Sequence, residues 1–160
     1  MDTEKNGRTT AVGLARYAMA YLQAAEVVDN EMGRGEEYAR ISPVPAYFLL
    51  VHGMELTLKA YLRHCGLTVE VLRGIGHELM PLLEKSRELG LDGLFVLTET
   101  DTKALKLLVA LNQYHQLRYI QTGLKEFPSW AIAMPFAFRL HQAIGPVVGF
   151  KSFTMAFAGY

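Results

Sequence analysis

The sequence predicts an all-α protein, an up-and-down bundle of about five helices, and three observations predict it. Apolar residues recur at spacings of three and four in several segments, which is the period of a helix. No alternating pattern of useful length indicates a strand. The 160 residues, 51% of them hydrophobic, are enough for one domain that buries a stable core without disulfide bonds or bound metals. We expect one domain over residues 1–160, with its core at about 9–145 and an apolar tail at 146–160.

The first helix is expected at residues 9–30. We expect the helix to end before Gly33 and Gly35. Residues 32–45 are polar and contain two prolines, so we expect them to form a surface loop. Its apolar face follows the helical period: Leu14, Tyr17, Ala18, Tyr21, Leu22, Ala25 and Val28.

The second helix is expected at residues 46–65, before Gly66. It has a broad apolar face and a second, smaller one that contains Gly53. Only a narrow ridge between the two faces is charged: His52, Glu55, Lys59 and Arg63. A helix that is apolar on most sides is usually buried between neighbours, so we expect this helix to be the central one.

The next elements are shorter. After a turn at residues 68–73, a third helix is expected at 78–89, followed by a connector at 91–99 that holds a short helical turn or an extended piece. The last helix is expected at residues 133–144, because Gly145 and Pro146 follow it.

The fourth helix, expected at residues 102–119, carries the most informative polar residues. Its plausible caps are Thr98 and Asp101. Asn112 and His115 interrupt an apolar stripe, and Arg118 lies three residues beyond His115. Two interpretations stay open: these residues are satisfied polar groups of the core that fix helix register, or they form a ligand site.

The ridge of the second helix also has two interpretations, a solvated charged strip or part of a site. We predict that two polar sets face each other across the bundle: Asn112, His115 and Arg118 on the fourth helix, and His52, Glu55 and Lys59 on the second. Glu55 would pair with Lys59 or Arg118, because a lone charge beside apolar walls is costly. Such a pocket would hold an anion. His77, after Gly74-Ile75-Gly76, is expected to cap the third helix or to orient a ligand.

Several chemistries are not indicated. The only cysteine, Cys65, excludes an intramolecular disulfide and a four-cysteine zinc site, and no His-x3-His pair exists. No Gly-x-Ser-x-Gly elbow or nucleotide phosphate loop is present either. We therefore predict no catalytic residue, no metal and no cofactor.

The charge balance bears on partners. Sixteen basic and sixteen acidic residues give a formal net charge of +0, which argues against strong nucleic-acid binding but allows a pocket for one phosphate. The longest weakly charged stretch, residues 130–150, is broken by prolines, and the chain opens with polar residues rather than a leader. We expect no membrane contact and a cytoplasmic location.

Three segments together resemble HEPN domains. The run from His52 to Leu62 is similar to the second-helix pattern of this family, and Gly76-His77-Glu78-Leu79 is similar to the Gly-His-x-Leu segment that begins the next helix. Leu111-Asn112-Gln113-Tyr114, with Arg118-Tyr119, resembles the last core helix. The segments follow in the family's order and span residues 46–119.

The resemblance implies a helical bundle, commonly a homodimer, and a link to RNA cleavage or to nucleotide or phosphate recognition in bacterial defence and toxin–antitoxin systems. Its ribonucleases use an Arg-x4–6-His motif. Arg118 matches the arginine, but the histidine positions hold Gly123, Leu124 and Lys125. We therefore expect a non-catalytic binding or regulatory module for a nucleotide or small anion, with a partner protein from a neighbouring gene. The candidate ligand-binding residues are Arg118, His115, Asn112, Tyr119, His52, Glu55, Lys59 and His77.

Two alternatives remain. One is a HEPN-type metal-independent ribonuclease or nucleotide-modifying enzyme that uses Arg118 with His115 or His52. The other is an unrelated helical bundle that binds a small apolar ligand, as the many Met, Phe and Tyr residues allow.

The apolar tail predicts a homodimer. Large apolar side chains stand where a chain terminus is usually polar: Phe150, Phe153, Met155, Phe157 and Tyr160. Either the core of the same domain or a second subunit would cover them.

Overall fold

The computed structural model describes residues 7–39, 41–113, 117, 119 and 122–151. Within these residues the all-α prediction is confirmed, because they form six α-helices, two short 3₁₀ helices and no strand. The α-helices are α2 (Ala11–Met32), α3 (Val44–His64), α4 (Val69–Ile75), α5 (Leu79–Glu88), α6 (Glu99–Asn112) and α7 (Trp130–Ile144). The 3₁₀ helices are Glu36–Tyr38 and Leu91–Gly93.

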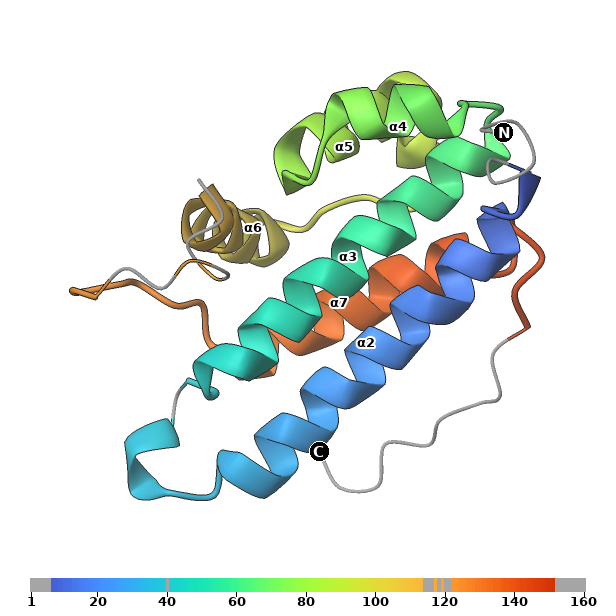
Figure 1. The fold of residues 1–160 in the computed structure, drawn as a ribbon. Helices are drawn as coiled ribbons and strands as arrows, with labels where there is room; N and C mark the ends of the chain where they lie inside the picture. The colour runs from blue at the N-terminus through green and yellow to red at the C-terminus, as the bar shows by residue number, and fades with distance from the viewer. Residues whose placement is uncertain (1–6, 40, 114–116, 118, 120–121, 152–160) are drawn as a thin grey trace.

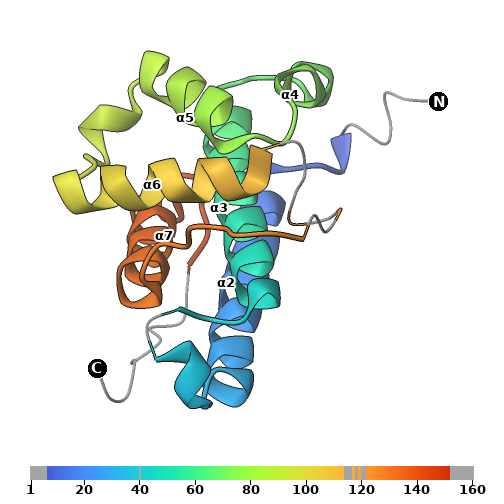
Figure 2. The same cartoon turned by 90° about the vertical axis from the view of Figure 1, so that its left-hand side faces the viewer.

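Three long helices form the body of the bundle (Figure 1). α2 and α3 run antiparallel, and α7 packs against both of them. Figure 2 shows α6 crossing in front of α3, with α4 and α5 at the upper end of the molecule. α3 contacts all five other α-helices, so the prediction that residues 46–65 form the central helix is confirmed.

α2 and α3 lie close together at Gly53. A Cβ atom on Gly53 would lie 2.8 Å from Leu22 Cγ and 3.2 Å from the carbonyl oxygen of Ala18. Leu22 exposes none of its surface, so it has no free space to move into. The small face that contains Gly53 therefore packs tightly, as its sequence pattern predicts.

Some predicted boundaries are wrong. α3 begins at Val44, so Pro45 belongs to its first turn rather than to the preceding loop, and a proline is tolerated there because that amide has no intrahelical partner. The predicted turn at residues 68–73 is instead part of α4. The Thr68 side chain caps this helix by accepting a hydrogen bond from the Val71 amide. α7 begins at Trp130, earlier than residue 133.

α6 begins earlier and ends earlier than predicted. Thr98 and Asp101 form a reciprocal capping box, in which each side chain accepts a hydrogen bond from the other residue's amide at 3.0 Å. The helix ends at Asn112, because Gln113 has extended backbone angles (φ −58°, ψ 134°). Leu117 and Tyr119 lie in turns, so the prediction that one helix continues to residue 119 is wrong.

The start of the apolar tail packs in cis. The Phe150 ring lies 5.3 Å from the His141 ring, and Val148 is buried in the core. Residues 152–160, including Phe153, Met155, Phe157 and Tyr160, lie outside the described residues, so the homodimer stays a prediction that light scattering would test.

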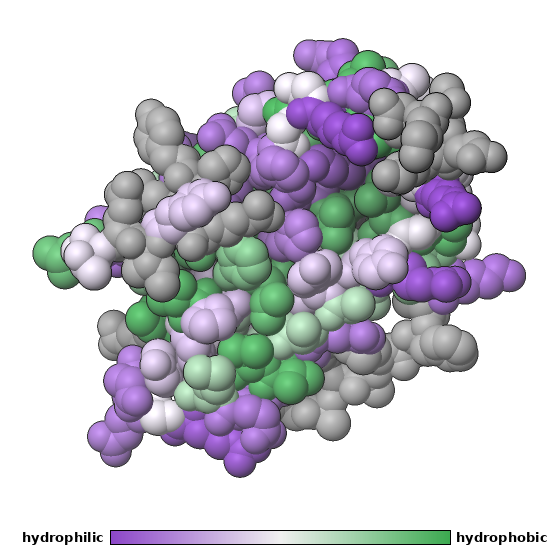
Figure 3. Space-filling model, in the orientation of Figure 1, coloured by the Kyte–Doolittle hydropathy of each residue, from purple (hydrophilic) through white to green (hydrophobic). Residues whose placement is uncertain are grey.

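The outer surface varies along the molecule. Figure 3 shows a mostly hydrophilic surface over α4 and α5, and apolar residues scattered among hydrophilic ones over α2 and α3. The apolar residues that α2 exposes include Tyr17 and Val27. None of the helices in the described part of the chain is long and apolar enough to cross a membrane.

Candidate functional site

The strongest concentration of polar chemistry surrounds Glu55, near the middle of the central helix. Its side chain is buried, because α3 is enclosed by the helices around it. Three nitrogen donors converge on its two oxygens. Lys59 Nζ and His77 Nδ1 donate to Oε1 at 2.7 and 2.8 Å, and His52 Nδ1 donates to Oε2 at 3.2 Å. We call these four residues the Glu55 cluster.

The electrostatics of the Glu55 cluster favour an ionised carboxylate. Burial raises the pKa of Glu55, but the hydrogen bonds from His52, Lys59 and His77 outweigh it and bring the pKa down to about 2. The carboxylate therefore carries its full charge at neutral pH. Lys59 is also buried, so the pair satisfies the rule that charges inside a protein are compensated by a partner.

The two imidazoles of the cluster differ in their surroundings. The His52 ring is held between aromatic rings, edge-on to Tyr21 at 4.4 Å and stacked with Phe48 at 6.4 Å, and 20% of its side chain is exposed. The His77 side chain is 52% exposed. His77 is therefore the member of the cluster that a ligand in solution meets first.

The backbone before α5 explains how His77 reaches the cluster. Gly76 closes α4 with φ of 91°, a conformation that favours glycine, and the chain turns there. Glu78 is the N-cap residue of α5, and His77 Nδ1 bonds Glu55 instead of an amide of that helix. The Nδ1 atom of His77 therefore contacts the Glu55 carboxylate, and the expected orientation of a ligand stays a prediction.

Asn112 joins the edge of the cluster from α6. Its side-chain amide donates to the backbone carbonyl of His77 at 3.4 Å, which links the end of α6 to the segment before α5. The structure thus brings together His52, Glu55, Lys59, His77 and Asn112. Tyr119 is 72% exposed in a turn. His115 and Arg118 lie outside the described residues.

Two predictions about the ridge of α3 are resolved by burial. The solvated-strip interpretation is wrong for Glu55 and Lys59, which expose only 4% and 9% of their surface. The predicted pairing of Glu55 with Lys59 is present. Arg63 lies on the same ridge, but its side chain does not join the cluster, because its guanidinium donates to the carbonyls of Thr9 and Leu67, both at 3.0 Å.

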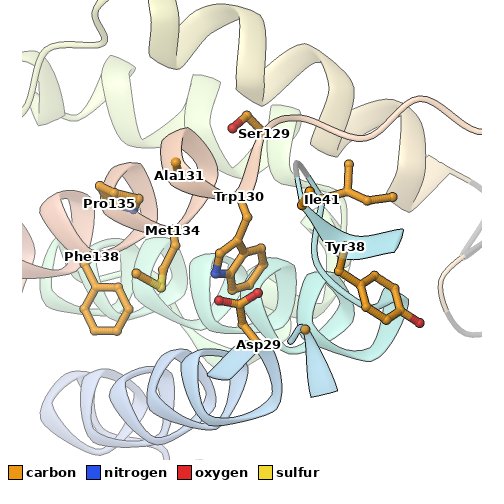
Figure 4. Close-up of a pocket in the computed structure, with 11 residues that line it drawn as sticks. Asp29, Tyr38, Ile41, Ser129, Trp130, Ala131, Met134, Pro135 and Phe138 are labelled. Carbon is orange, nitrogen blue, oxygen red and sulfur yellow. The ribbon is translucent and has the colours of Figure 1, made fainter. Parts of the chain in front are cut away.

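A cavity lies beside the segment that precedes α3, and the sequence did not predict it. The C-terminal end of α2, the residues Tyr38, Ala39 and Ile41, and the start of α7 line this cavity of about 640 Å³ (Figure 4). Its wall contains the single tryptophan, Trp130, and one carboxylate, Asp29. We call it the Trp130 pocket.

Metal chemistry has no support in this part of the chain. Among the described residues no group of three or more His, Cys, Asp or Glu side chains is arranged to hold a metal ion. In the Glu55 cluster an ammonium group already lies beside both the carboxylate and the imidazole, since Lys59 Nζ is 2.7 Å from Glu55 Oε1 and 3.5 Å from His77 Nδ1.

Comparisons of this chain with protein-family models, with curated proteins and with solved structures found no match. The resemblance to HEPN domains therefore stays a prediction.

Proposed function

We propose that this protein is a non-catalytic binding or regulatory module that recognises a phosphate-bearing ligand, such as a nucleotide, at the Glu55 cluster. One observation carries the proposal. Three nitrogen donors are gathered around one buried carboxylate, and the donor residue His77 is half exposed at the surface.

The chemistry of the donors fits a phosphate. Glu55 and Lys59 cancel each other's charge, and the two imidazoles add further nitrogen donors to the cluster. An ammonium has three donors, of which Glu55 takes one, and the bond from Nδ1 to Glu55 fixes the orientation of the His77 ring. A phosphate would accept hydrogen bonds from this nitrogen-rich edge.

The size of the ligand follows from the charge of the whole chain. A formal net charge of +0 provides no extended basic surface for a polymer of phosphates, so a single nucleotide or small phosphate fits better than a nucleic acid. All five residues of the site lie in the segments that resemble HEPN domains, which supports a regulatory role, a homodimer and a partner protein from a neighbouring gene.

Calorimetry tests this proposal. We expect ADP and inorganic pyrophosphate to bind the wild-type chain, and adenosine, which lacks phosphate, not to bind. His77→Gln should weaken ADP binding about tenfold, a change of about 1.4 kcal/mol. The matched control is His64→Gln, which removes an exposed imidazole at the C-terminal end of α3 and should leave ADP binding unchanged. Absence of phosphate binding, or equal losses in the two variants, would contradict the proposal.

A second candidate function, the metal-independent ribonuclease, has one observation in its favour. Glu55 holds the Nδ1 atom of His77 at 2.8 Å, which is how a carboxylate orients a general-base histidine. The discriminating experiment incubates the protein with single-stranded and transfer RNA in the presence of a chelator. We expect no cleavage above background. If the protein cleaves RNA, and if His77→Gln abolishes this cleavage while His64→Gln does not, the protein is an enzyme and the proposal of a non-catalytic module is wrong.

A further inference from the structure

The Trp130 pocket has the size and the walls of a small-molecule site. Its volume of about 640 Å³ lies within the range of roughly 300–1,000 Å³ that is usual for such sites. Its walls are mostly apolar and aromatic side chains from the segment after α2 and from α7: Tyr38, Ile41, Trp130, Met134, Pro135 and Phe138 (Figure 4).

Asp29 places a carboxylate in this apolar setting. The residue is partly buried, yet within the described part of the chain its carboxylate takes part in no hydrogen bond or ion pair. A partly desolvated charge without a partner is unfavourable, so a cation brought to it gains more than it would on the open surface.

Trp130 provides a second, independent sign of an incomplete site. The residue is 6% exposed, and its indole nitrogen has no hydrogen-bond partner among the residues that the structure describes. Buried polar groups nearly always have a partner, so an orphaned donor is unfavourable. Figure 4 shows the indole nitrogen turned toward the same part of the pocket as the Asp29 carboxylate.

The charge around the pocket is negative. Residues 26–41 hold five acidic side chains and two basic side chains, a formal charge of −3. One of the basic residues, Arg34, pairs with Glu31 and is itself well exposed. The described part of this segment forms one rim of the pocket, and its negative charge attracts cations and repels anions.

From these observations we propose that the Trp130 pocket binds a small amphipathic amine. Its ammonium group pairs with Asp29, and its apolar body lies against Trp130 and Met134. Aromatic walls favour such a ligand further, because the face of an aromatic ring attracts a cation. An oxygen acceptor on the same ligand would satisfy the indole N–H once side chains around it move. This proposal does not rest on the phosphate site, which lies in a different part of the molecule.

Three probes of similar shape and different charge test the proposal: 3-phenylpropylamine, 3-phenylpropanol and 3-phenylpropionate. Because the chain has one tryptophan, its single indole N–H signal in a proton–nitrogen NMR spectrum reports directly on the pocket. We expect the amine to shift that signal saturably. The alcohol should bind about tenfold more weakly, and the carboxylate more weakly still.

Two variants separate a contact with Asp29 from general attraction. Asp29→Asn should weaken binding of the amine about tenfold and leave binding of the alcohol unchanged. The matched control, Glu31→Gln, removes one negative charge from the same helix at a side chain that is 68% exposed, and should have little effect.

Four results would overturn the proposal. The first is the absence of a saturable shift at 10 mM amine, which corresponds to about 2.7 kcal/mol of binding free energy, and the second is equal affinity for the three probes. The third is an equal loss of amine affinity in the two variants. The fourth is a change of the indole signal on deletion of residues 152–160 that matches the change caused by the amine. The last result would show that the chain's own terminal segment fills the pocket.

Discussion

Glu55 on α3 and Asp29 on α2 are carboxylates in opposite circumstances. Glu55 is 4% exposed and accepts hydrogen bonds from three nitrogen donors. Asp29 is only partly buried, and among the described residues its carboxylate has no hydrogen-bond or ion-pair partner. The two side chains have the same chemistry, so the difference lies in what the fold places around them.

The contrast shows that burial decides whether a charged side chain must be paired within the fold or can stay free to bind a ligand. An ion that is fully enclosed has to be compensated within the fold, because its desolvation costs several kcal/mol. An ion at a pocket wall keeps part of its hydration and does not need a partner for the chain to fold. We therefore expect changes at Glu55 to act on stability, and changes at Asp29 to act on ligand binding.

Truncation of the two carboxylates has the largest expected effect. Glu55→Ala leaves the buried Lys59 ammonium without its partner and should lower the free energy of unfolding by about 3–5 kcal/mol. Asp29→Ala breaks no hydrogen bond or ion pair within the described part of the chain and should change the free energy of unfolding by at most about 0.5 kcal/mol. Urea unfolding measures both, and similar values for the two variants would remove the distinction.

Acid should weaken the Glu55 cluster over a defined pH range. The pKa of Glu55 is about 2 in the folded chain and 4.5 ordinarily, so its stabilisation is complete above pH 4.5 and is lost as the pH falls toward 2. The loss amounts to ~3 kcal/mol.

Unfolding curves at several pH values compare the wild type with Glu55→Gln. Their stability difference should shrink steadily below pH 4.5. Other groups also respond to acid, such as Asp101, whose pKa is raised by burial but lowered on balance by Arg139, and His141, whose pKa is lowered by burial. These groups are common to both chains, so the difference isolates Glu55. A constant difference between the two chains would mean that the charge of Glu55 does not stabilise the fold.

Packing beside the cluster has a smaller expected effect. Gly53→Leu, two residues before Glu55, forces new atoms against Leu22 and should destabilise the fold by about 1–3 kcal/mol. The matched control is Gly74→Ala in α4, where nothing lies within 4 Å of the added carbon and the better helix propensity should stabilise slightly. An unchanged melting temperature for Gly53→Leu would show that α2 and α3 are free to separate.

Local periodicity accounts for the part of the site that could be predicted. His52, Glu55 and Lys59 share one ridge of one helix, so their spacing alone brings them together. His77 could not be placed there, because its position depends on the turn at Gly76 and on how α5 packs against α3.

The features that the sequence analysis did not predict correctly also depend on tertiary packing or on missing local signals. The Trp130 pocket was not predicted because Asp29 and Trp130 are far apart in the sequence and meet only through the packing of α2 and α7. The end of α6 was misplaced because its apolar spacing continues through Leu117 and Tyr119, and no glycine or proline interrupts the chain before Gly123.

The histidine signals of the folded protein test the proposed phosphate site most directly. NMR resolves the imidazole nitrogens and protons of the five histidines, and inorganic pyrophosphate is titrated in. We predict that His77 and His52 shift saturably with one common dissociation constant, and that His64 and His141 do not move with it. Shifts that are equal at all histidines, or that spare His77, would contradict the assignment of the Glu55 cluster as the phosphate site.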